Sequence, residues 1–462
     1  MMKKKKNYLN KVLWTAFVLL MVAAVTVFGI RFHTGSVAEA APLTTGQVIY
    51  NSSIYEMGKI CDRNGNVIVE GTESREIYWC DPQAEAIMEP LLGVDLNETM
   101  NSPYTVLGTC PWLYGIGDER LNVKGLLTPW KARVGGDVKL TIDMDLEREI
   151  DRVLEESGFA NGRVVVSNYI TGEIYAVYGD TQTQMNPPGS TMKPILASAI
   201  LNIRPDLRSY TYNCAAENHY FYTEEGTRHY IACAGEAEHG LMTMDTAMAY
   251  SCNGFFISLL QQVDKDALLK ELQKYGFDTT IAYNDFHYYD HVFLGNESEG
   301  TDFLLAAIGQ ANASMSVIGL NSCMSALMNH GTLQEPKLID SAIYQAGEEW
   351  ESRAEGEQYV ISSAEVANDV VNMMQGVTEY GTGKKFAYPN FVAKTGTSEK
   401  LIVEKGSADN TFAVWTTGGL VNEEYPYCIT VCLDNVNNQI ASYDAGIVAR
   451  EILTYMIVKG GV

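Results

Sequence analysis

An uncharged and mostly apolar stretch runs from Val12 to Ile30 near the start of the chain. A helix of that length can cross the hydrocarbon core of a bilayer. Lysines stand at positions 3–6 and 11, and the rest of the chain is acidic, so the positive-inside rule places the N-terminus in the cytoplasm. We therefore predict a retained single-pass anchor with the bulk of the chain outside the cell membrane. The alternative is a cleaved signal peptide, because Ala38-Glu39-Ala40 resembles a small-residue cleavage site.

Shorter patterns beyond this stretch predict the elements of a globular domain. Two runs rich in β-branched and aromatic residues, Arg163–Ser167 and Glu173–Tyr178, bracket Ile170-Thr171-Gly172 and predict a hairpin. Helical periodicity begins near Ser190 and recurs further along the chain. The later predicted elements are two helices (Asp266–Tyr275 and Thr301–Ala311), three strands (Phe391–Thr395, Thr411–Thr416 and Tyr427–Leu433) and a closing helix (Ser442–Ile457). This order favours an α+β fold, in which an antiparallel sheet is flanked by helices.

The chain has 462 residues and an apolar content of 46%, enough for one large core and a smaller domain. No internal repeat or low-complexity linker divides it, but Gly135-Gly136 has the composition of a hinge. We expect a cytoplasmic tail and anchor over residues 1–41, a small domain over 42–136 and the main domain over 137–462.

The charge balance limits the partners of this protein. There are 57 acidic and 33 basic residues, and the formal net charge is −24. Such a surface repels nucleic acid and offers no broad basic patch for phosphates, so we expect no nucleic-acid partner.

Nine cysteines are an odd number for an exported chain, so at least one is unpaired or intermolecular. Two pairs are disulfide candidates: Cys214 with Cys233, which flank a polar stretch, and Cys428 with Cys432, whose even spacing puts them on one face of a strand. Buried free thiols are the favoured alternative, because the spacing shows no dense disulfide framework. His229 with Cys233 or His239 lacks the paired spacing of a ligand set, so we predict no metal site and no cofactor.

The candidate chemistry is concentrated in Pro187-Pro188-Gly189-Ser190-Thr191-Met192-Lys193-Pro194. If a helix begins near Ser190, residues three apart share a face, so the Lys193 amine can reach the Ser190 hydroxyl. A serine hydroxyl is a poor nucleophile without a base, and a lysine becomes a base when burial beside another cation lowers its pKa. Ser-x-x-Lys alone is a weak signal, which many solvated helices contain by chance.

Two later segments strengthen this signal. Ser251-Cys252-Asn253 and Lys394-Thr395-Gly396 follow Ser190-x-x-Lys193 in the order of the S-x-x-K, S-x-N and K-T-G trio of penicillin-binding proteins and β-lactamases. At these residues the chain resembles class B penicillin-binding proteins. Further matches to that family are Gly58–Gly65, Leu140-Thr141-Ile142-Asp143, His239-Gly240, Ile308-Gly309-Gln310 and Gly381-Thr382-Gly383. The resemblance extends from about Leu140 to the C-terminus, while Asn66–Lys139 matches poorly and is short for the family's pedestal domain.

The resemblance implies a five-stranded antiparallel sheet with a helical subdomain, together with a small pedestal and a membrane anchor. It also implies a role for each site residue. Ser190 is the acylated nucleophile, Lys193 its base, and Ser251 the relay that passes a proton to the leaving amine. Asn253 holds the substrate amide and contacts Lys193. The third motif binds the substrate carboxylate and lines the strand edge, where Gly396 permits close approach; its residues are Lys394, Thr395, Gly396 and Thr397.

The function implied is a peptidoglycan D,D-transpeptidase that cross-links stem peptides ending in D-Ala-D-Ala and is inhibited by β-lactams. The implied partners are these stem peptides, β-lactams, the membrane and a transmembrane glycan polymerase. Two alternatives remain: a D,D-carboxypeptidase or β-lactamase-type hydrolase, and a non-catalytic cell-wall scaffold. A β-lactamase is disfavoured because no Glu-x-x-Leu-Asn element follows Asn253, and intact motif residues argue against a scaffold.

Overall fold

We analysed a computed structural model of the chain. The structure describes residues 21, 54–56, 58–71, 77–93, 106, 113, 133–134, 136–223, 226–279, 288, 291–294, 300–343, 351–352, 356–400, 411–436 and 442–460. Of the predicted anchor Val12–Ile30, only Met21 belongs to these residues. Within the described ranges, no helix combines the length and the apolar character that crossing a membrane requires.

The main domain is built on a five-stranded antiparallel sheet, as predicted. Its strands, in spatial order, are β17 (Phe391–Lys400), β18 (Thr411–Leu420), β19 (Tyr427–Val436), β7 (Arg163–Asn168) and β8 (Ile174–Tyr178). The predicted hairpin forms β7 and β8, and the three predicted C-terminal strands form β17 to β19 with longer bounds. The sheet therefore joins two segments that are far apart in the sequence, and β17 lies at its edge.

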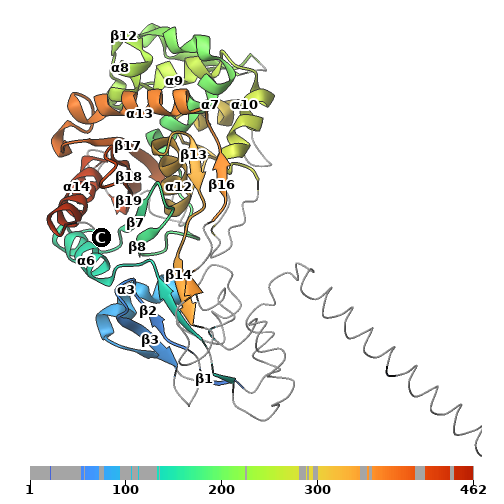
Figure 1. The fold of residues 1–462 in the computed structure, drawn as a ribbon. Helices are drawn as coiled ribbons and strands as arrows, with labels where there is room; N and C mark the ends of the chain where they lie inside the picture. Colours follow the sequence, from blue (N-terminus) through green and yellow to red (C-terminus); the bar gives the residue numbers. More distant parts are fainter. Residues whose placement is uncertain are drawn as a thin grey trace, which may run out of the picture.

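Helices cover both faces of this sheet (Figure 1). On one face, α6 (Met144–Glu156) and α14 (Ser442–Val458) enclose an apolar core with strand residues such as Val164 and Ile429. On the other, α12 (Val317–Met328) packs against β19 and β7. Because both faces are buried, the strands are apolar at successive positions rather than alternating: all six residues of β7 are buried.

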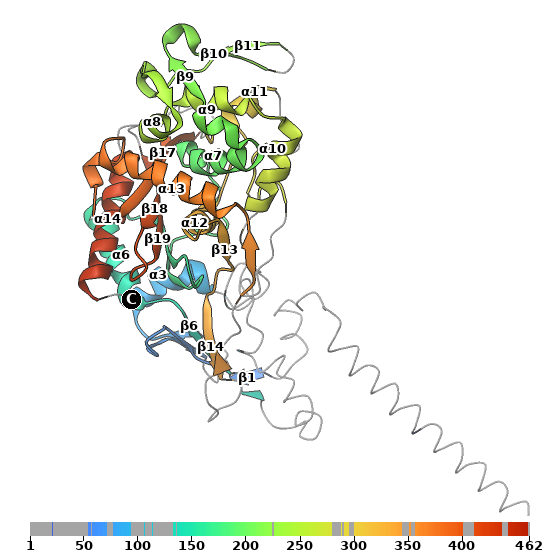
Figure 2. The same ribbon diagram turned by 45° about the horizontal axis from the view of Figure 1, so that its top comes forward.

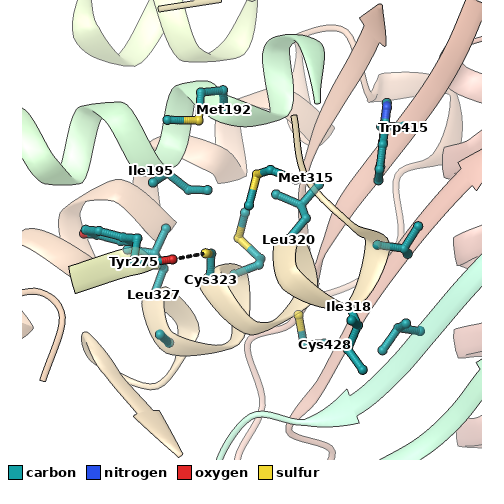
Figure 3. Packing of buried hydrophobic residues seen from close by; sticks show 14 of the residues in the cluster. Met192, Ile195, Tyr275, Met315, Ile318, Leu320, Cys323, Leu327, Trp415 and Cys428 are labelled. Carbon is teal, nitrogen blue, oxygen red and sulfur yellow. Dashed lines mark hydrogen bonds between the residues drawn. The ribbon is translucent and has the colours of Figure 1, made fainter. Parts of the chain in front are cut away.

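Helix α12 lies between the sheet and α7 (Met192–Ile203), the helix that carries the predicted base (Figure 3). Met192 and Ile195 of α7, Cys323 and Leu327 of α12 and Trp415 of β18 all belong to one buried cluster. The apolar packing beneath the candidate site thus continues into the sheet and fixes the position of α7.

A helical subdomain stands above the sheet (Figure 2). Its helices are α7, α8 (Met244–Ala249), α9 (Asn253–Leu260), α10 (Lys265–Leu272), α11 (Gly300–Ala306) and α13 (Ala364–Glu379). Short pairs decorate it: β9 (Thr211–Cys214) with β12 (Gly240–Thr243), and β10 (Tyr220–Tyr222) with β11 (Arg228–Tyr230). A further pair, β13 (Thr332–Gln334) with β16 (Gln358–Val360), lies beside α12. The 3₁₀ turns are η3 (Gly189–Thr191), η4 (Pro205–Ser209), η5 (Ala216–Asn218), η6 (Ala234–Glu236), η7 (Gln273–Tyr275) and η8 (Lys384–Phe386).

One predicted helix was too long. Periodicity suggested a helix over Thr301–Ala311, but α11 ends at Ala306. Gly309 and Ala311 both have positive φ, at 68° and 57°, which a right-handed helix cannot accommodate. The turn they form packs against Gly189, next to the candidate nucleophile.

A second, six-stranded sheet lies at the opposite end of the molecule from the helical subdomain (Figure 1). Its order is β15 (Glu351–Ser352), β14 (Ile339–Ile343), β6 (Asp137–Leu140), β2 (Ile60–Cys61), β3 (Val67–Gly71) and β4 (Ile77–Trp79), with α3 (Pro82–Leu92) beside it. A further parallel pair joins β1 (Ile54–Glu56) and β5 (Arg133–Val134). Since β14 and β15 come from beyond residue 137, both sides of the predicted domain boundary contribute to this sheet.

The disulfide candidates were wrong. Cys214, Cys233, Cys428 and Cys432 are all buried and form no disulfide, in agreement with the favoured alternative of buried thiols. Cys428 and Cys432 do share one face of β19, as their spacing predicted, because both belong to the cluster on the α12 side of the sheet.

Candidate active site

Ser190 lies in the 3₁₀ turn η3, directly before α7. Gly189 adopts φ 55° and comes so close to β17 that a Cβ there would lie 2.6 Å from the Thr397 carbonyl oxygen. Its N–H donates to the carbonyl of Gly309 at 2.9 Å. The turn before Ser190 is therefore held between the edge strand and the Gly309 turn, and only glycine fits this position without strain.

Lys193 stands in the first turn of α7, and its side chain is fully buried. Its Nζ donates to the Ser251 carbonyl at 2.7 Å, to Ser251 Oγ at 3.1 Å and to Asn253 Oδ1 at 2.8 Å. The predicted contact between Asn253 and Lys193 is confirmed. Among the hydrogen bonds of the described residues, none joins Ser190 Oγ to Lys193; such catalytic bonds commonly tighten only when substrate is bound.

Ser251 lies between α8 and α9 and is the point where the three motifs meet. Its Oγ accepts from Lys193 on one side and from Lys394 Nζ, at 3.0 Å, on the other. Its φ is 58°, a left-handed conformation that costs a non-glycine residue roughly 1–2 kcal/mol. Asn253, two residues later, is itself held in place, because its Nδ2 donates to the Ala232 carbonyl at 3.0 Å. A strained turn thus aims one hydroxyl at two lysines.

Burial lowers the pKa of both lysines. Desolvation lowers the pKa of Lys193 to about 8, despite the opposing effect of the Cys252 and Cys233 thiols nearby. The pKa of Lys394 is also lowered, first by burial and then by the charge of Lys193. The predicted pairing of Lys193 with Lys394 is therefore present, and a neutral amine is accessible near physiological pH.

The third motif lies on β17, which in the described part of the chain pairs only with β18. Lys394 Nζ donates to the Thr395 carbonyl at 2.8 Å, and the Thr395 and Thr382 hydroxyls are 2.8 Å apart. An edge strand of this kind can accept an extended peptide alongside it. Thr382 belongs to the Gly381-Thr382-Gly383 match, but sequence reasoning gave it no role.

Gly396 makes a close approach, although to a different neighbour from the one expected. We expected it to admit the substrate; instead, a Cβ at Gly396 would lie 2.7 Å from the Pro188 carbonyl oxygen and 2.9 Å from Thr191 Cγ2. Thr397, next along the strand, accepts from Gln310 Nε2 at 3.2 Å through its carbonyl. Gln310 belongs to the Ile308-Gly309-Gln310 match, but the sequence gave it no role, because its contact with β17 depends on how the Gly309 turn packs against Gly189.

Comparison with known families agrees with this geometry. Residues 162–454 match the family described as "Penicillin binding protein transpeptidase domain". Among curated proteins, the chain is 24% identical over 344 residues to stage V sporulation protein D of Bacillus subtilis. That match covers 66% of this chain and 51% of the relative, so the chain spans about half the length of that protein.

Solved structures share the fold. Penicillin-binding protein A of M. tuberculosis, solved as a ceftriaxone acyl-enzyme complex, has a TM-score of 0.72 at 18% identity, covering 87% of this chain and 98% of that one. Penicillin-binding protein 3 of the same organism has a TM-score of 0.69 at 20% identity, covering 87% and 96%. The D,D-transpeptidase domain of a peptidoglycan glycosyltransferase from Eggerthella lenta has a TM-score of 0.66 at 19% identity, covering 88% and 100%.

Proposed function

The chain belongs to the family of penicillin-binding protein transpeptidase domains, and on this premise we propose that it is a peptidoglycan D,D-transpeptidase acting through an acyl-enzyme on Ser190. The observation that carries the proposal is the meeting of two lysines at one hydroxyl, Ser251 Oγ: Lys193, which lies one helical turn after Ser190, and Lys394 of β17. It supplies a nucleophile, a base of lowered pKa and a proton relay in one place.

The first half-reaction forms the ester. Neutral Lys193 takes the proton of the Ser190 hydroxyl as its oxygen attacks the carbonyl between the two D-alanines of a stem peptide. The tetrahedral intermediate collapses, and Ser251 passes a proton from Lys193 to the departing amine of the terminal D-alanine. We assign the oxyanion to the backbone N–H groups of Ser190 and Thr397, and the substrate's terminal carboxylate to the Lys394 side of β17.

The second half-reaction transfers the acyl group. The amine of a neighbouring stem peptide attacks the ester carbonyl, its proton returns through Ser251 and Lys193 to the Ser190 oxygen, and a peptide cross-link results. A β-lactam carries out only the first half, because its opened ring stays attached and blocks the acceptor.

Labelling with a fluorescent penicillin tests the assignment. Intact-mass analysis should show one drug adduct per wild-type chain and none on Ser190→Ala, while the matched control Ser209→Ala, an exposed serine after α7, keeps the adduct. A chain that takes no label in any form would be the non-catalytic scaffold, and an adduct on Ser190→Ala would move the nucleophile elsewhere.

We prefer cross-linking to hydrolysis because, among the described residues, no carboxylate is hydrogen-bonded to the catalytic groups. In the part of the chain that the structure describes, the hydrogen bonds of Lys193, Ser251, Asn253 and Lys394 include no Asp or Glu that could activate water. A thioester analogue offered with an excess of D-amino acid should therefore give mainly the aminolysis product. Free acid at every acceptor concentration, or rapid loss of the penicillin adduct, would establish a carboxypeptidase or a β-lactamase instead.

We also propose that Val12–Ile30 anchors the chain, with the catalytic domain outside the membrane and a transmembrane glycan polymerase beside it. The apolar run and its preceding lysines support this topology. Protease added to intact spheroplasts should digest the domain while the N-terminal segment stays in the membrane. Release of a soluble protein that begins at Ala41 would show a cleaved signal peptide.

A further inference from the structure

Three cysteines and one histidine cluster directly behind the second motif. The ligand atoms of Cys214, Cys233, His239 and Cys252 all lie within 4.8 Å of one another. The three thiols are buried and His239 is half-buried. Sequence reasoning predicted no metal site, because the spacing of these residues follows no familiar ligand pattern. His229, which it considered beside them, instead contacts the Thr301 hydroxyl at 3.1 Å.

Three of the ligand–ligand distances in the cluster are close to the edges of a tetrahedron around a metal ion, and the remaining ones stay within 4.8 Å. The Sγ atoms of Cys214 and Cys233 are 3.7 Å apart, and those of Cys233 and Cys252 are 3.8 Å apart. Zinc–sulfur bonds of about 2.3 Å at tetrahedral angles place sulfurs about 3.8 Å apart. The Cys214 Sγ to His239 Nδ1 distance of 3.4 Å is near the sulfur–nitrogen edge of about 3.6 Å for the same geometry. A disulfide would need about 2.05 Å.

Rigid elements bring the four ligands together. Cys214 ends β9 and pairs with Gly240 of β12, so His239, the preceding residue, stays beside it. Cys233 is the N-cap of η6, and Cys252 is the N-cap of α9. Four separate segments of the helical subdomain therefore converge on one point.

Hydrogen-bond donors surround the sulfurs, as they do around metal-bound thiolates. The Asn253 N–H donates to Cys233 Sγ at 3.3 Å, and the Phe255 N–H donates to Cys252 Sγ at 3.5 Å. Nε2 of the buried His219 lies 3.2 Å from Cys214 Sγ and donates to it in the tautomer protonated there. Donors of this kind orient the ligands of a metal ion and stabilise their negative charge.

We propose that Cys214, Cys233, His239 and Cys252 form a structural site for a thiophilic divalent cation, Zn²⁺, that holds the second motif in its working conformation. Three thiolates and one imidazole match the preferences of zinc, whereas calcium and magnesium require oxygen ligands. Four protein ligands close the coordination sphere, so the ion takes no direct part in the acyl transfer.

Because Cys252 lies within the second motif, a bound ion would also restrain the residues that contact the two lysines. This half of the proposal rests on the proposed function. Cys252 stands between Ser251, which contacts both lysines, and Asn253, which contacts Lys193. Ser251 is held in the left-handed conformation, which the turn would leave if nothing held it. A bond from Cys252 to the metal ion would supply that restraint on Ser251. Cys233 would restrain Asn253 in the same way, because its Sγ accepts from the Asn253 N–H.

Metal content tests the site itself. Full-length protein, purified in detergent under reducing conditions from zinc-supplemented cells and dialysed, should contain about one zinc ion per chain by elemental mass spectrometry. Replacing zinc with Co²⁺ should give the intense visible bands of tetrahedral thiolate coordination. Cys233→Ser and His239→Ala should lose both signals, whereas Cys323→Ser and Cys80→Ser, free cysteines outside the cluster, should keep them. Wild-type protein that retains no zinc and gives no cobalt bands, or that contains a Cys214–Cys233 disulfide, would overturn the site.

Acylation tests the positioning role. Removing zinc with a chelator should lower the melting temperature and slow acylation by a fluorescent penicillin at least about tenfold, and added zinc should restore both. Cys214 is the proposed ligand most distant from Ser251 in the sequence, and Cys214→Ser should behave like wild type from which zinc has been removed. Zinc that binds but whose removal leaves acylation unchanged would refute the positioning role. If wild type never acylates, the proposed function fails, while the metal content and the cobalt spectrum still decide the site.

Discussion

Replacing Gly396 with alanine should slow acylation more than its effect on the stability of the fold can explain. In Gly396→Ala the new Cβ would lie 2.7 Å from the Pro188 carbonyl oxygen and 3.1 Å from the Thr191 nitrogen. Ordinary contacts begin near about 3.4 Å, so the Pro188–Thr191 segment must move by roughly half an ångström; overpacking of this kind costs about 1–3 kcal/mol. Ser190 lies within that segment, and displacements of this order slow chemistry by up to about 10²-fold.

The control is a glycine whose replacement costs stability far from the site. Gly158 has φ 78°, and a Cβ there would meet no atom within 4 Å, so Gly158→Ala should lose about 1–2 kcal/mol through backbone strain alone. Both variants should therefore melt at lower temperatures. Time courses of fluorescent-penicillin acylation should be slower only for Gly396→Ala, by at least about tenfold. Wild-type acylation by a folded Gly396→Ala protein would refute the view that β17 positions Ser190.

Three further predictions follow from buried charged groups. If neutral Lys193 is the base, a pKa of about 8 means that acylation accelerates about tenfold from pH 7 to pH 9. Lys193→Arg should acylate at least ~10²-fold more slowly and lack that rise, whereas the exposed control Lys270→Arg should behave like wild type. A flat pH profile of the wild type would contradict the assignment. Burial raises the pKa of Glu147 to about 8, so the folded chain keeps a proton that the unfolded chain loses above about 4.5, and stability falls as pH rises between those values. The glutamine of Glu147→Gln does not titrate, so the stability of the variant relative to wild type should rise by on the order of 3 kcal/mol between pH 5 and pH 8, measured by urea unfolding. A fall in that relative stability at pH 8 would show that the fold needs the carboxyl ionised. Asp434→Asn should cost about 3–5 kcal/mol in the same assay, because Arg163, joined to Asp434 at 2.6 Å, would be left as an uncompensated buried charge; a change below about 1 kcal/mol would mean that solvent reaches the pair.

Local sequence was informative where one segment determines both structure and chemistry. Ser190 and Lys193 share a turn of chain, and the hairpin of β7 and β8 joins neighbouring residues, so motif and periodicity found both. The contact of Lys394 with Ser251 joins strands and helices far apart in the sequence; the trio of motifs pointed to it only through family resemblance.

Other features had no local signal. The helix over residues 301–311 was predicted too long because periodicity continues past Ala306, whereas the positive φ of Gly309 depends on packing against Gly189. The six-stranded sheet takes β14 and β15 from a distant part of the chain, which no pattern in either strand indicates. The cysteine–histidine cluster forms only after β9, β12 and the turns carrying Cys233 and Cys252 have assembled.

The strand order of the main sheet also determines when the protein can acquire its activity. The central pairing aligns Val166 of β7 with Ile429 of β19, positions roughly 260 residues apart in the chain. Until the last strands have been synthesised, the β7–β8 hairpin has no partner, its edge is open, and Lys394 cannot meet Ser251. A chain that emerges from the ribosome therefore carries Ser190, the proposed nucleophile, for most of its synthesis without the contacts proposed to activate it, so labelling by a penicillin would report completed folding as well as chemistry. Such non-local pairing is slow and leaves aggregation-prone edges exposed, so this domain should depend on folding assistance during its biogenesis.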